Sequence, residues 1–298
     1  MRPALVAPPG LASSSGQRSN PTLSERGRRT RRRHRGLGAV EFLVALPILL
    51  FVGLGVLQFG LVFQAKHALN VALIEAARAG SVEHADPDAV RAGLARGLVP
   101  WLYGAADLGE YTLNLARARA HIVQGELLGW IRLGQLSPTS ASFDDWGEPA
   151  RDANGERIAG LREIPNDNLA SRALRTRPAR GVAGARAGAP IGSASGQTLA
   201  DANLLQLQLD YGVPLAVPVV GRLIVWTLRA WDGCAVPAPR RYGLLGLDAP
   251  WPPGTVRPRA CPMYGASDGS RIRLPVRVGA TIRMQSPARH AGAGPVLD

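Results

Sequence analysis

An uncharged apolar run at residues 42–63 limits what this chain of 298 residues can fold into. Its sequence is FLVALPILLFVGLGVLQFGLVF, in which Gln58 is the one strongly polar side chain. As an α-helix these 22 residues would extend about 33 Å, which is close to the thickness of the hydrocarbon core of a bilayer. A soluble core helix is rarely apolar on every face over such a length. The run therefore predicts a membrane-spanning helix, in which Pro47 is tolerated.

The basic charge of the chain is concentrated before this run. The formal net charge is +13, and the first 35 residues, with nine arginines and one acidic residue, carry +8 of it. The arginines nearest the run include Arg28, Arg29, Arg31, Arg32, Arg33 and Arg35. By the positive-inside rule they place the N-terminus in the cytoplasm and the residues after the run on the other side of the membrane. Residues 1–36 are expected to form a disordered basic cytoplasmic leader.

Two other interpretations of the N-terminal region are less favoured by the sequence. A cleaved secretory or twin-arginine signal peptide also joins a basic segment to an apolar one, but its apolar part is only about 7–15 residues long and ends at a small-x-small site. The first such tripeptide here, Ala77-Arg78-Ala79, lies well past the run. A nucleic-acid-binding arm is the second interpretation. Residues 26–35 contain no aromatic side chain that could stack on a base, so no nucleic-acid partner is expected.

Glu41 lies at the start of the apolar run, where a carboxylate near lipid is costly. One explanation is a position among the head groups, favoured by the positive end of the helix dipole. Another comes from residues 35–42, RGLGAVEF, which resemble the processing site of type IV pilin-like precursors. That resemblance implies cleavage between Gly36 and Leu37 by a prepilin peptidase, with Glu41 fifth in the mature chain. Glu41 would then pair with the N-terminal amine of a neighbouring subunit, since opposite charges lower each other's desolvation cost in a low dielectric.

A longer stretch resembles the TadE-like family of tight-adherence (Flp-type) pilus assembly proteins. The resemblance rests on RGLGAVEFLVALPILLFVGLGVLQFG at residues 35–60 and on AARAG at residues 76–80. It implies a single-pass inner-membrane minor pilin (pseudopilin) or assembly factor, with no catalysis and no cofactor. Its partners would be membrane lipid, other pilus subunits and inner-membrane assembly proteins. Residues 37–80 would form the transmembrane helix and its periplasmic extension.

The remaining residues, 81–298, are expected to form a periplasmic α+β domain whose helices pack on an antiparallel sheet. The first helix should continue to Gly80, a good helix stop. Asp86-Pro87 marks the start of the next helix, which Pro100 should end. Residues 111–123 fit a helix or a strand equally well. Alternating apolar residues predict half-buried antiparallel strands, and they occur at residues 205–211 and 271–285.

Two features of this domain allow more than one interpretation. The second alternating segment carries arginines on one face, which is either a solvated face or a docking surface for an acidic partner; they are Arg271, Arg273, Arg277 and Arg283. Its Pro275 suits an edge strand. Residues 213–226 are apolar but too short to span a bilayer. They predict a core element, or alternatively an interfacial segment anchored by Trp226 and Trp231.

Cys234 and Cys261 are expected to form a disulfide, because both fall in the proposed periplasmic part, where disulfides persist. A bridge over that span would contribute about 3–4 kcal/mol to stability; two separate buried thiols are the alternative. No catalytic or metal site is expected. Residues 192–196, GSASG, place Ala194 where a nucleophile elbow has serine and are interpreted as a flexible loop. The alternative function is a signal-anchored periplasmic enzyme or binding module unrelated to pili.

Overall fold

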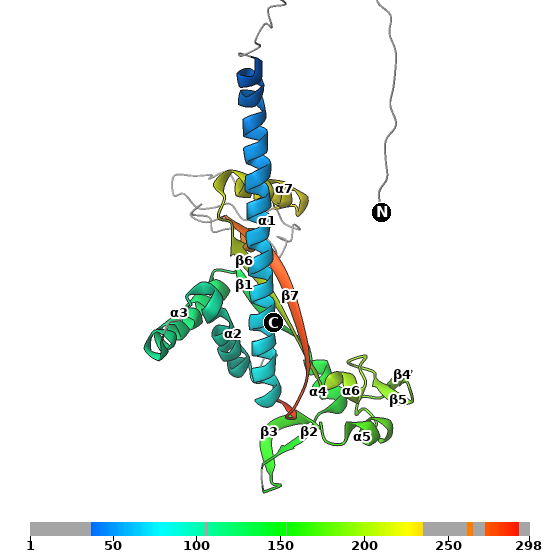
Figure 1. Cartoon of the computed structure of the whole chain (residues 1–298). Helices are drawn as coiled ribbons and strands as arrows, with labels where there is room; N and C mark the ends of the chain where they lie inside the picture. The colour runs from blue at the N-terminus through cyan, green and yellow to red at the C-terminus, as the bar shows by residue number, and fades with distance from the viewer. Residues whose placement is uncertain (1–36, 105–106, 153, 235–260, 265–271, 292–298) are drawn as a thin grey trace, which may run out of the picture. The chain divides into compact units, whose positions relative to one another are not determined.

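The computed structural model describes residues 37–104, 107–152, 154–234, 261–264 and 272–291 (Figure 1). Its contacts divide the chain into two units, Met1–Pro47 and Ile48–Asp298. A long apolar N-terminal helix, α1 (Leu37–Val82), is followed by a domain of helices and antiparallel sheets. The expected α+β class is therefore confirmed. The leader at residues 1–36 lies outside the described residues.

Helices and strands are interspersed along the described chain after α1. The helices are α2 (Pro87–Leu102), α3 (Leu108–Leu127), α4 (Ser140–Trp146), α5 (Leu169–Arg175), α6 (Leu199–Ala202) and α7 (Pro218–Trp231), with a 3-10 turn η1 (Cys261–Tyr264). The strands are β1 (Ile131–Ser137), β2 (Glu148–Arg151), β3 (Arg157–Ile164), β4 (Val182–Arg186), β5 (Ala189–Gly192), β6 (Leu204–Pro214), β7 (Arg273–Arg283) and β8 (Ala288–His290).

The main sheet has the order β1-β6-β7, with all neighbours antiparallel. Both strands predicted from alternation are confirmed, as β6 and β7, and they pair along their whole length from Leu204 opposite Arg283 to Pro214 opposite Arg273. The alternation exists because every second side chain of β6 enters the core. Pro275 lies on the edge strand β7, as expected, where a missing amide costs no ladder hydrogen bond. Two smaller sheets have the orders β2-β3-β8 and β4-β5.

The second half of α1 belongs to the core of the body. Its small and aliphatic side chains are buried at helical spacing; they include Ala65, Leu69, Ala72, Leu73 and Ala76. They share one cluster with β6 residues such as Leu207, and with residues of α2 such as Leu94. The body is thus built around the continuation of the apolar helix.

The helix ends agree with the sequence in part. The N-cap of α2 is Asp86, whose carboxylate accepts a hydrogen bond from Ala89 N at 3.0 Å, as expected. The expectation that Pro100 ends this helix is wrong, because α2 continues to Leu102. So close to the C-terminus a proline removes a single helical hydrogen bond. The amides of Tyr103 and Gly104 then close the helix on the carbonyl of Val99, both at 3.0 Å.

The ambiguous segment at residues 111–123 is helical and lies within α3. Its start is fixed by Asp107, which accepts from Glu110 N at 2.7 Å. Ala118 and Ile122 are buried four residues apart, which is the helical period. The first helix also runs slightly further than expected, to Val82 and not to Gly80.

The C-terminal part of the chain is fastened to the end of α1. The amides of Gln285 and Ser286 both donate to the carbonyl of Ser81, at 2.9 and 3.0 Å. In return His84 N donates to Ser286 Oγ at 2.9 Å, and the His84 ring lies 2.8 Å from the carbonyl of Pro287. These bonds join residues about two hundred positions apart. The start and the end of the body therefore close on each other at this point.

Candidate membrane and assembly site

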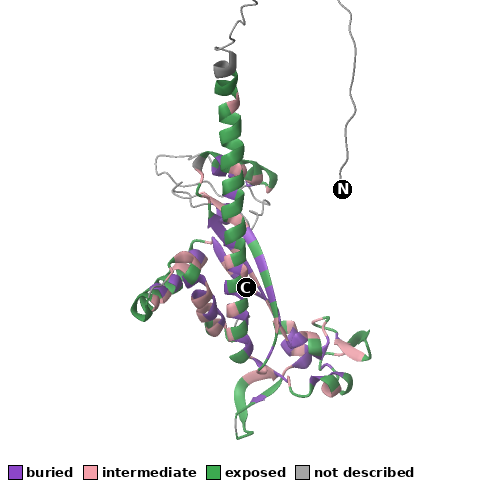
Figure 2. Ribbon diagram, in the orientation of Figure 1, coloured by how far each residue is buried: buried purple, intermediate pink, exposed green. Residues whose placement is uncertain are grey.

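The first half of α1 exposes its apolar side chains on all sides (Figure 2). The exposed residues before Gln58 include Phe42, Leu43, Val44, Ile48, Leu49, Leu50, Phe51, Val52, Val56 and Leu57. Only 6% of the most apolar stretch of this helix is buried, which excludes the core helix of a soluble protein. Among the described residues it is the one helix long and apolar enough to cross a membrane. Such a surface is stable where the surroundings are themselves apolar.

Gln58 marks the point where α1 begins to contact the body. Its side chain is 1% exposed, although Leu57 before it is 62% exposed and Phe59 after it is 54% exposed. The carboxamide Oε1 accepts a hydrogen bond of 2.8 Å from the backbone amide of Val217, the N-cap residue of α7. The sequence singles out Gln58 as the polar residue of the run but gives no sign of this partner, which lies 159 positions away.

The candidate assembly residues lie at the start of α1, in the unit Met1–Pro47. Glu41 is exposed on the helix, four residues after Leu37, where the helix begins. Among the described residues no ion pair of Glu41 occurs. Gly36 and the arginines of the leader lie outside the described residues, and the expected cleavage between Gly36 and Leu37 stays a prediction.

Beyond Gln58, α1 and α2 pack closely against each other at two glycines of α2. A Cβ atom added at Gly97 would lie 2.5 Å from Ala72 Cα, and one added at Gly93 would lie 2.8 Å from Ala76 Cα. The four-residue spacing puts both glycines on the same face of α2, against a stripe of alanines on α1. The spacing is visible in the sequence as G-x-x-x-G, but outside an apolar run two glycines at this spacing do not by themselves predict helix packing.

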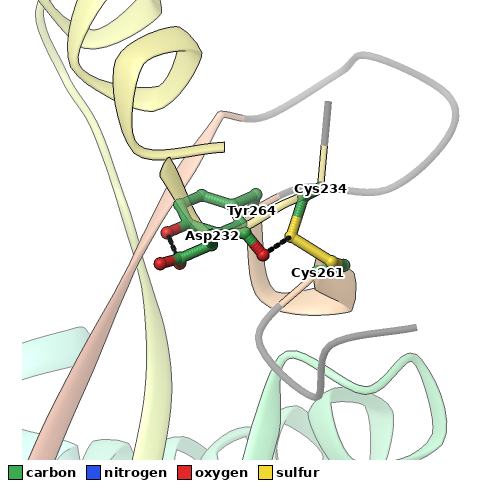
Figure 3. The surroundings of a disulfide bond; sticks show 4 residues. All are labelled: Asp232, Cys234, Cys261 and Tyr264. Atoms are coloured by element: carbon green, nitrogen blue, oxygen red, sulfur yellow. Dashed lines mark hydrogen bonds between the residues drawn. A yellow bond between two sulfur atoms is a disulfide. The ribbon is translucent and has the colours of Figure 1, made fainter. Parts of the chain in front are cut away.

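The disulfide between Cys234 and Cys261 is present, as expected, and it joins the end of α7 to η1 (Figure 3). Next to it Tyr264 donates a hydrogen bond to the carboxylate of Asp232. Burial and this carboxylate both raise the pKa of the Tyr264 hydroxyl. Val225 of α7, the two cysteines and Tyr264 form a small buried cluster separate from the main core. The prolines between the cysteines lie outside the described residues.

The apolar segment at residues 213–226 differs from the expected core element. It divides into the end of β6 and the helix α7. One face of α7 is buried, but Val219, Leu223 and Trp226 are exposed on the other. The core interpretation is therefore correct for only half of the segment.

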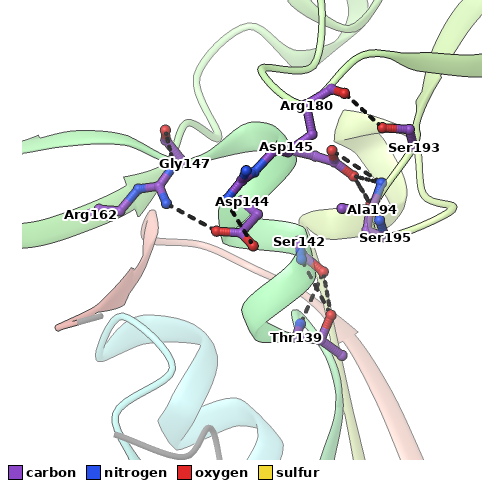
Figure 4. A network of polar contacts seen from close by, with 10 residues as sticks. All are labelled: Thr139, Ser142, Asp144, Asp145, Gly147, Arg162, Arg180, Ser193, Ala194 and Ser195. Carbon is purple, nitrogen blue, oxygen red and sulfur yellow. Dashed lines mark hydrogen bonds and ion pairs between the residues drawn. The ribbon is translucent and has the colours of Figure 1, made fainter. Parts of the chain in front are cut away.

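A buried carboxylate, that of Asp145, accepts several hydrogen bonds from one turn (Figure 4). Asp145, at the end of α4, is 2% exposed and accepts from Ser195 N and Ser195 Oγ, both at 2.7 Å, and from Ala194 N at 3.1 Å. A Cβ atom at Gly192 would collide with this carboxylate. Residues 192–196 are thus held in place, and their interpretation as a flexible loop is wrong. The printed bonds of this carboxylate all go to the turn, and the Asp145 carbonyl accepts from Ala179 N at 2.8 Å, so the arrangement stabilises the fold.

An aromatic cluster lies where β1 and β6 meet α3. Tyr211 is almost fully buried, with its hydroxyl 2.7 Å from His121 Nε2 and its ring in edge contact with Trp101 and Trp130. Burial raises the pKa of the Tyr211 hydroxyl. The guanidinium of Arg273 lies over the Trp130 ring at 3.9 Å. Arg273 is one of the arginines expected on one face of β7, and its guanidinium packs on the buried ring of Trp130.

The other described arginines of β7 lie on the outside. Arg277 pairs with Asp210 of β6 at 2.6 Å, and this hydrogen bond raises the pKa of the Arg277 guanidinium. Arg283 is exposed, and Arg271 lies outside the described residues. Arg277 and Arg283 therefore fit the interpretation as a solvated face, on which Arg277 forms a cross-strand ion pair.

Comparison with known proteins identifies one segment of the chain. Residues 36–78 match a family model described as TadE-like protein. No curated protein and no solved structure matches the chain. The matched segment begins at the expected cleavage position, contains Glu41 and the exposed apolar surface, and ends within the part of α1 that packs on α2.

Proposed function

We propose that this chain, which carries a TadE-like segment at residues 36–78, is a single-pass inner-membrane minor pilin or assembly factor of a tight-adherence pilus. The TadE-like family implies a part in the assembly of such pili. The chain would act by inserting α1 into the membrane and by associating with other pilus subunits and inner-membrane assembly proteins. It would carry out no catalytic turnover, and membrane lipid would be a constant partner.

The observation that carries this proposal is the change in the surroundings of α1 at Gln58. Before this residue the helix exposes apolar side chains on every face, and after it the same helix forms the core of the body. A detachable anchor would need no such continuity. A subunit that positions its body through contacts made in the membrane needs the two parts to move together.

The orientation proposed for the chain follows from charge and from the disulfide. The arginines before the run favour a cytoplasmic N-terminus. The body would then lie in the periplasm, where a disulfide such as Cys234–Cys261 forms and persists.

The proposed assembly contact is made by Glu41. After a prepilin peptidase cuts between Gly36 and Leu37, the new amine of one subunit would pair with the Glu41 carboxylate of its neighbour. Each charge lowers the cost of holding the other near lipid. Before cleavage that amine does not exist, so association would depend on processing.

Mutation of Glu41 tests this function. Glu41→Ala and Glu41→Gln should both reduce the number of pili and the amount of pilus subunit that co-purifies with the chain, because both remove the charge. Glu83→Gln, which neutralises an exposed carboxylate just after α1, is the matched control and should leave both unchanged. Pili and association at wild-type levels in both Glu41 variants would favour a plain signal anchor for an unrelated periplasmic module.

N-terminal sequencing of the membrane-extracted protein tests the processing step separately. Leu37 as the first residue is the expected result. Gly36→Leu should leave the leader attached and reduce association to the level of the Glu41 variants. An intact N-terminus in the wild-type chain would contradict the cleavage and leave the amine partner of Glu41 without a source.

A further inference from the structure

We propose that α7 is a membrane-surface helix that lies in the head-group region of the bilayer crossed by α1. Its exposed apolar stripe would contact the upper acyl chains, and Arg222 and Arg229 would contact the phosphates of anionic lipids. The proposal rests on the proposed function, because it needs α1 to span a bilayer. It adds a second, lateral contact between the body and the membrane.

The exposed stripe of α7 is continuous along the helix. Val219, Leu223, Trp226 and Ala230 follow one another at intervals of four, three and four residues, which places them on one face. Val219 is 68% exposed, Trp226 is 69% exposed, and Trp231 at the end of the helix is 89% exposed. Tryptophan at such positions is typical of the boundary between lipid and water.

The opposite face of α7 already has its partners. Val220 and Val225 are buried, and Val225 packs with Leu215 and Leu228 on the disulfide. The helix is therefore apolar on two faces, of which the body covers one. A second apolar face that remains in water has a cost in solvation free energy, which an apolar neighbour would remove.

The charges of α7 select an anionic neighbour. The helix contains Arg222 and Arg229 and no acidic residue. Their spacing of seven residues places both arginines along the same margin of the apolar stripe. Neither forms an ion pair with a carboxylate in the described part of the chain. Arginine beside an apolar face is the composition of helices that bind the surface of anionic membranes.

The position of α7 on α1 identifies that neighbour as lipid. The hydrogen bond from Val217 N to Gln58 Oε1 places the start of α7 at the level of residue 58 (Figure 1). The apolar run continues for five more residues, which is about 7.5 Å of helix. Phe59, Leu61 and Phe63 are exposed at this level. Interfacial helices bury their apolar face about 5–10 Å into the boundary region, so α7 begins at the depth such a helix would occupy.

The attachments at both ends of α7 hold it at this depth. Its N-cap is bonded to α1, and the residue Leu215 just before it donates to the carbonyl of Ile272 at 3.0 Å. Beyond its C-terminus the disulfide joins Cys234 to Cys261 in η1, a turn that contacts β7. The helix is thus fixed to the main sheet as well as to the span.

Quenching by brominated lipid tests the proposal on the full chain. The protein is reconstituted into vesicles of phosphatidylethanolamine and phosphatidylglycerol whose acyl chains carry bromine near the head groups. The quenched fraction of tryptophan emission should fall at least twofold in the variant Trp226→Phe/Trp231→Phe. Trp146→Phe, at a buried tryptophan, is the matched control and should retain the quenching. Equal quenching in the wild-type chain and the double variant would overturn the proposal.

Hydrogen exchange of the α7 amides tests the role of the charges. Exchange should be slower in vesicles that contain phosphatidylglycerol than in vesicles of phosphatidylcholine alone. Arg222→Gln/Arg229→Gln should remove most of this difference, which we expect to be about thirtyfold for two arginines at an anionic surface. Protection that appears in native membranes but in neither kind of vesicle would show that a protein covers the stripe, and would overturn the assignment to lipid.

Extraction with alkaline carbonate separates failure of this inference from failure of the proposed function. The wild-type chain and all α7 variants should remain in the membrane, because α1 holds them there. Release of the wild-type chain would contradict the spanning role of α1 itself. Retention of every variant together with absent quenching would reject the α7 proposal alone.

Discussion

Two residues without side chains set the distance between α1 and α2. At Gly97 the backbone of α2 lies so close to Ala72 that a single added carbon would meet the Cα atom of α1. The same holds for Gly93 at Ala76. Small residues at four-residue spacing allow two helices to pack backbone against backbone, as they do in membranes. Here the contact belongs to the part of α1 that packs in the body.

Gly97→Ala is expected to lower the free energy of unfolding by about 1–3 kcal/mol, because the helices must separate. The effect should appear despite the gain of about 1 kcal/mol that alanine has over glycine in helix propensity. Gly134→Ala is the control, since a Cβ atom there meets nothing within 4 Å. Urea unfolding in detergent measures both variants. Equal stability of the two would show that α2 can shift without cost.

Tyr211 is the second residue whose surroundings give a prediction. Burial raises the pKa of its hydroxyl, so the folded state keeps a proton that the unfolded state begins to lose near pH 10. The stabilisation from this group is therefore complete below about pH 10 and is lost as the pH rises above it.

Tyr211→Phe should cost about 1 kcal/mol at pH 8, because the hydrogen bond to His121 is lost. Above pH 10 that deficit should shrink by about 1.4 kcal/mol per pH unit, since phenylalanine has no proton to lose. Chemical unfolding at several pH values between 8 and 11 measures the deficit. A deficit for Tyr211→Phe that does not depend on pH would contradict the assignment.

At the scale of elements, α7 and η1 depend on the disulfide. The two cysteines are 27 positions apart, and their small core contains few other apolar residues. Closing a loop of that length removes entropy from the unfolded chain equivalent to about 3.5 kcal/mol.

Cys234→Ser/Cys261→Ser should therefore lower the free energy of unfolding by about 3 kcal/mol. Hydrogen exchange should show the loss first in the α7 amides, whereas β1 and β6 keep their protection because the main core does not include the cysteines. Uniform loss of protection across the sheet would mean that the disulfide supports the whole body.

The elements also show how far the sequence could predict this structure. The run at residues 42–63 and the alternation in β6 and β7 are local patterns, and each predicts its element correctly. The rule that proline ends a helix fails at Pro100. Because α2 ends at Leu102, the proline removes only one helical hydrogen bond there. Gln58 with Val217 and Asp145 with Ser195 are contacts between distant segments. Their partners depend on how the whole chain packs, which no local pattern contains.

At the scale of the whole molecule, the spanning helix and the body share residues. The sequence predicts a division after residue 80, and that division stays a prediction. Leu69 and Leu73 of α1 are fully buried in the core that also holds Leu207 and Leu209. A body that begins after α1 would lack the α1 side chains that form part of its core.

Two fragments test this dependence. A fragment of residues 64–298 keeps the buried half of α1 and should unfold cooperatively. A fragment of residues 81–298 should show neither a cooperative transition nor a near-ultraviolet circular dichroism signal, because several fully buried side chains are missing. Cooperative unfolding of the shorter fragment would show that the body is independent of the helix.

The lock between α1 and α2 has a mechanical consequence. From Ile48 to Val82 α1 is a continuous helix. Its C-terminal part contacts α2 at Gly93 and Gly97, and the carbonyl of Ser81 accepts hydrogen bonds from the amides of Gln285 and Ser286. With these contacts in place, α1 cannot rotate about its own axis unless α2 and the segment of Gln285 and Ser286 rotate with it. If α1 crosses a bilayer as proposed, a neighbouring helix that rotates its exposed apolar part would also rotate α2 and the segment of Gln285 and Ser286.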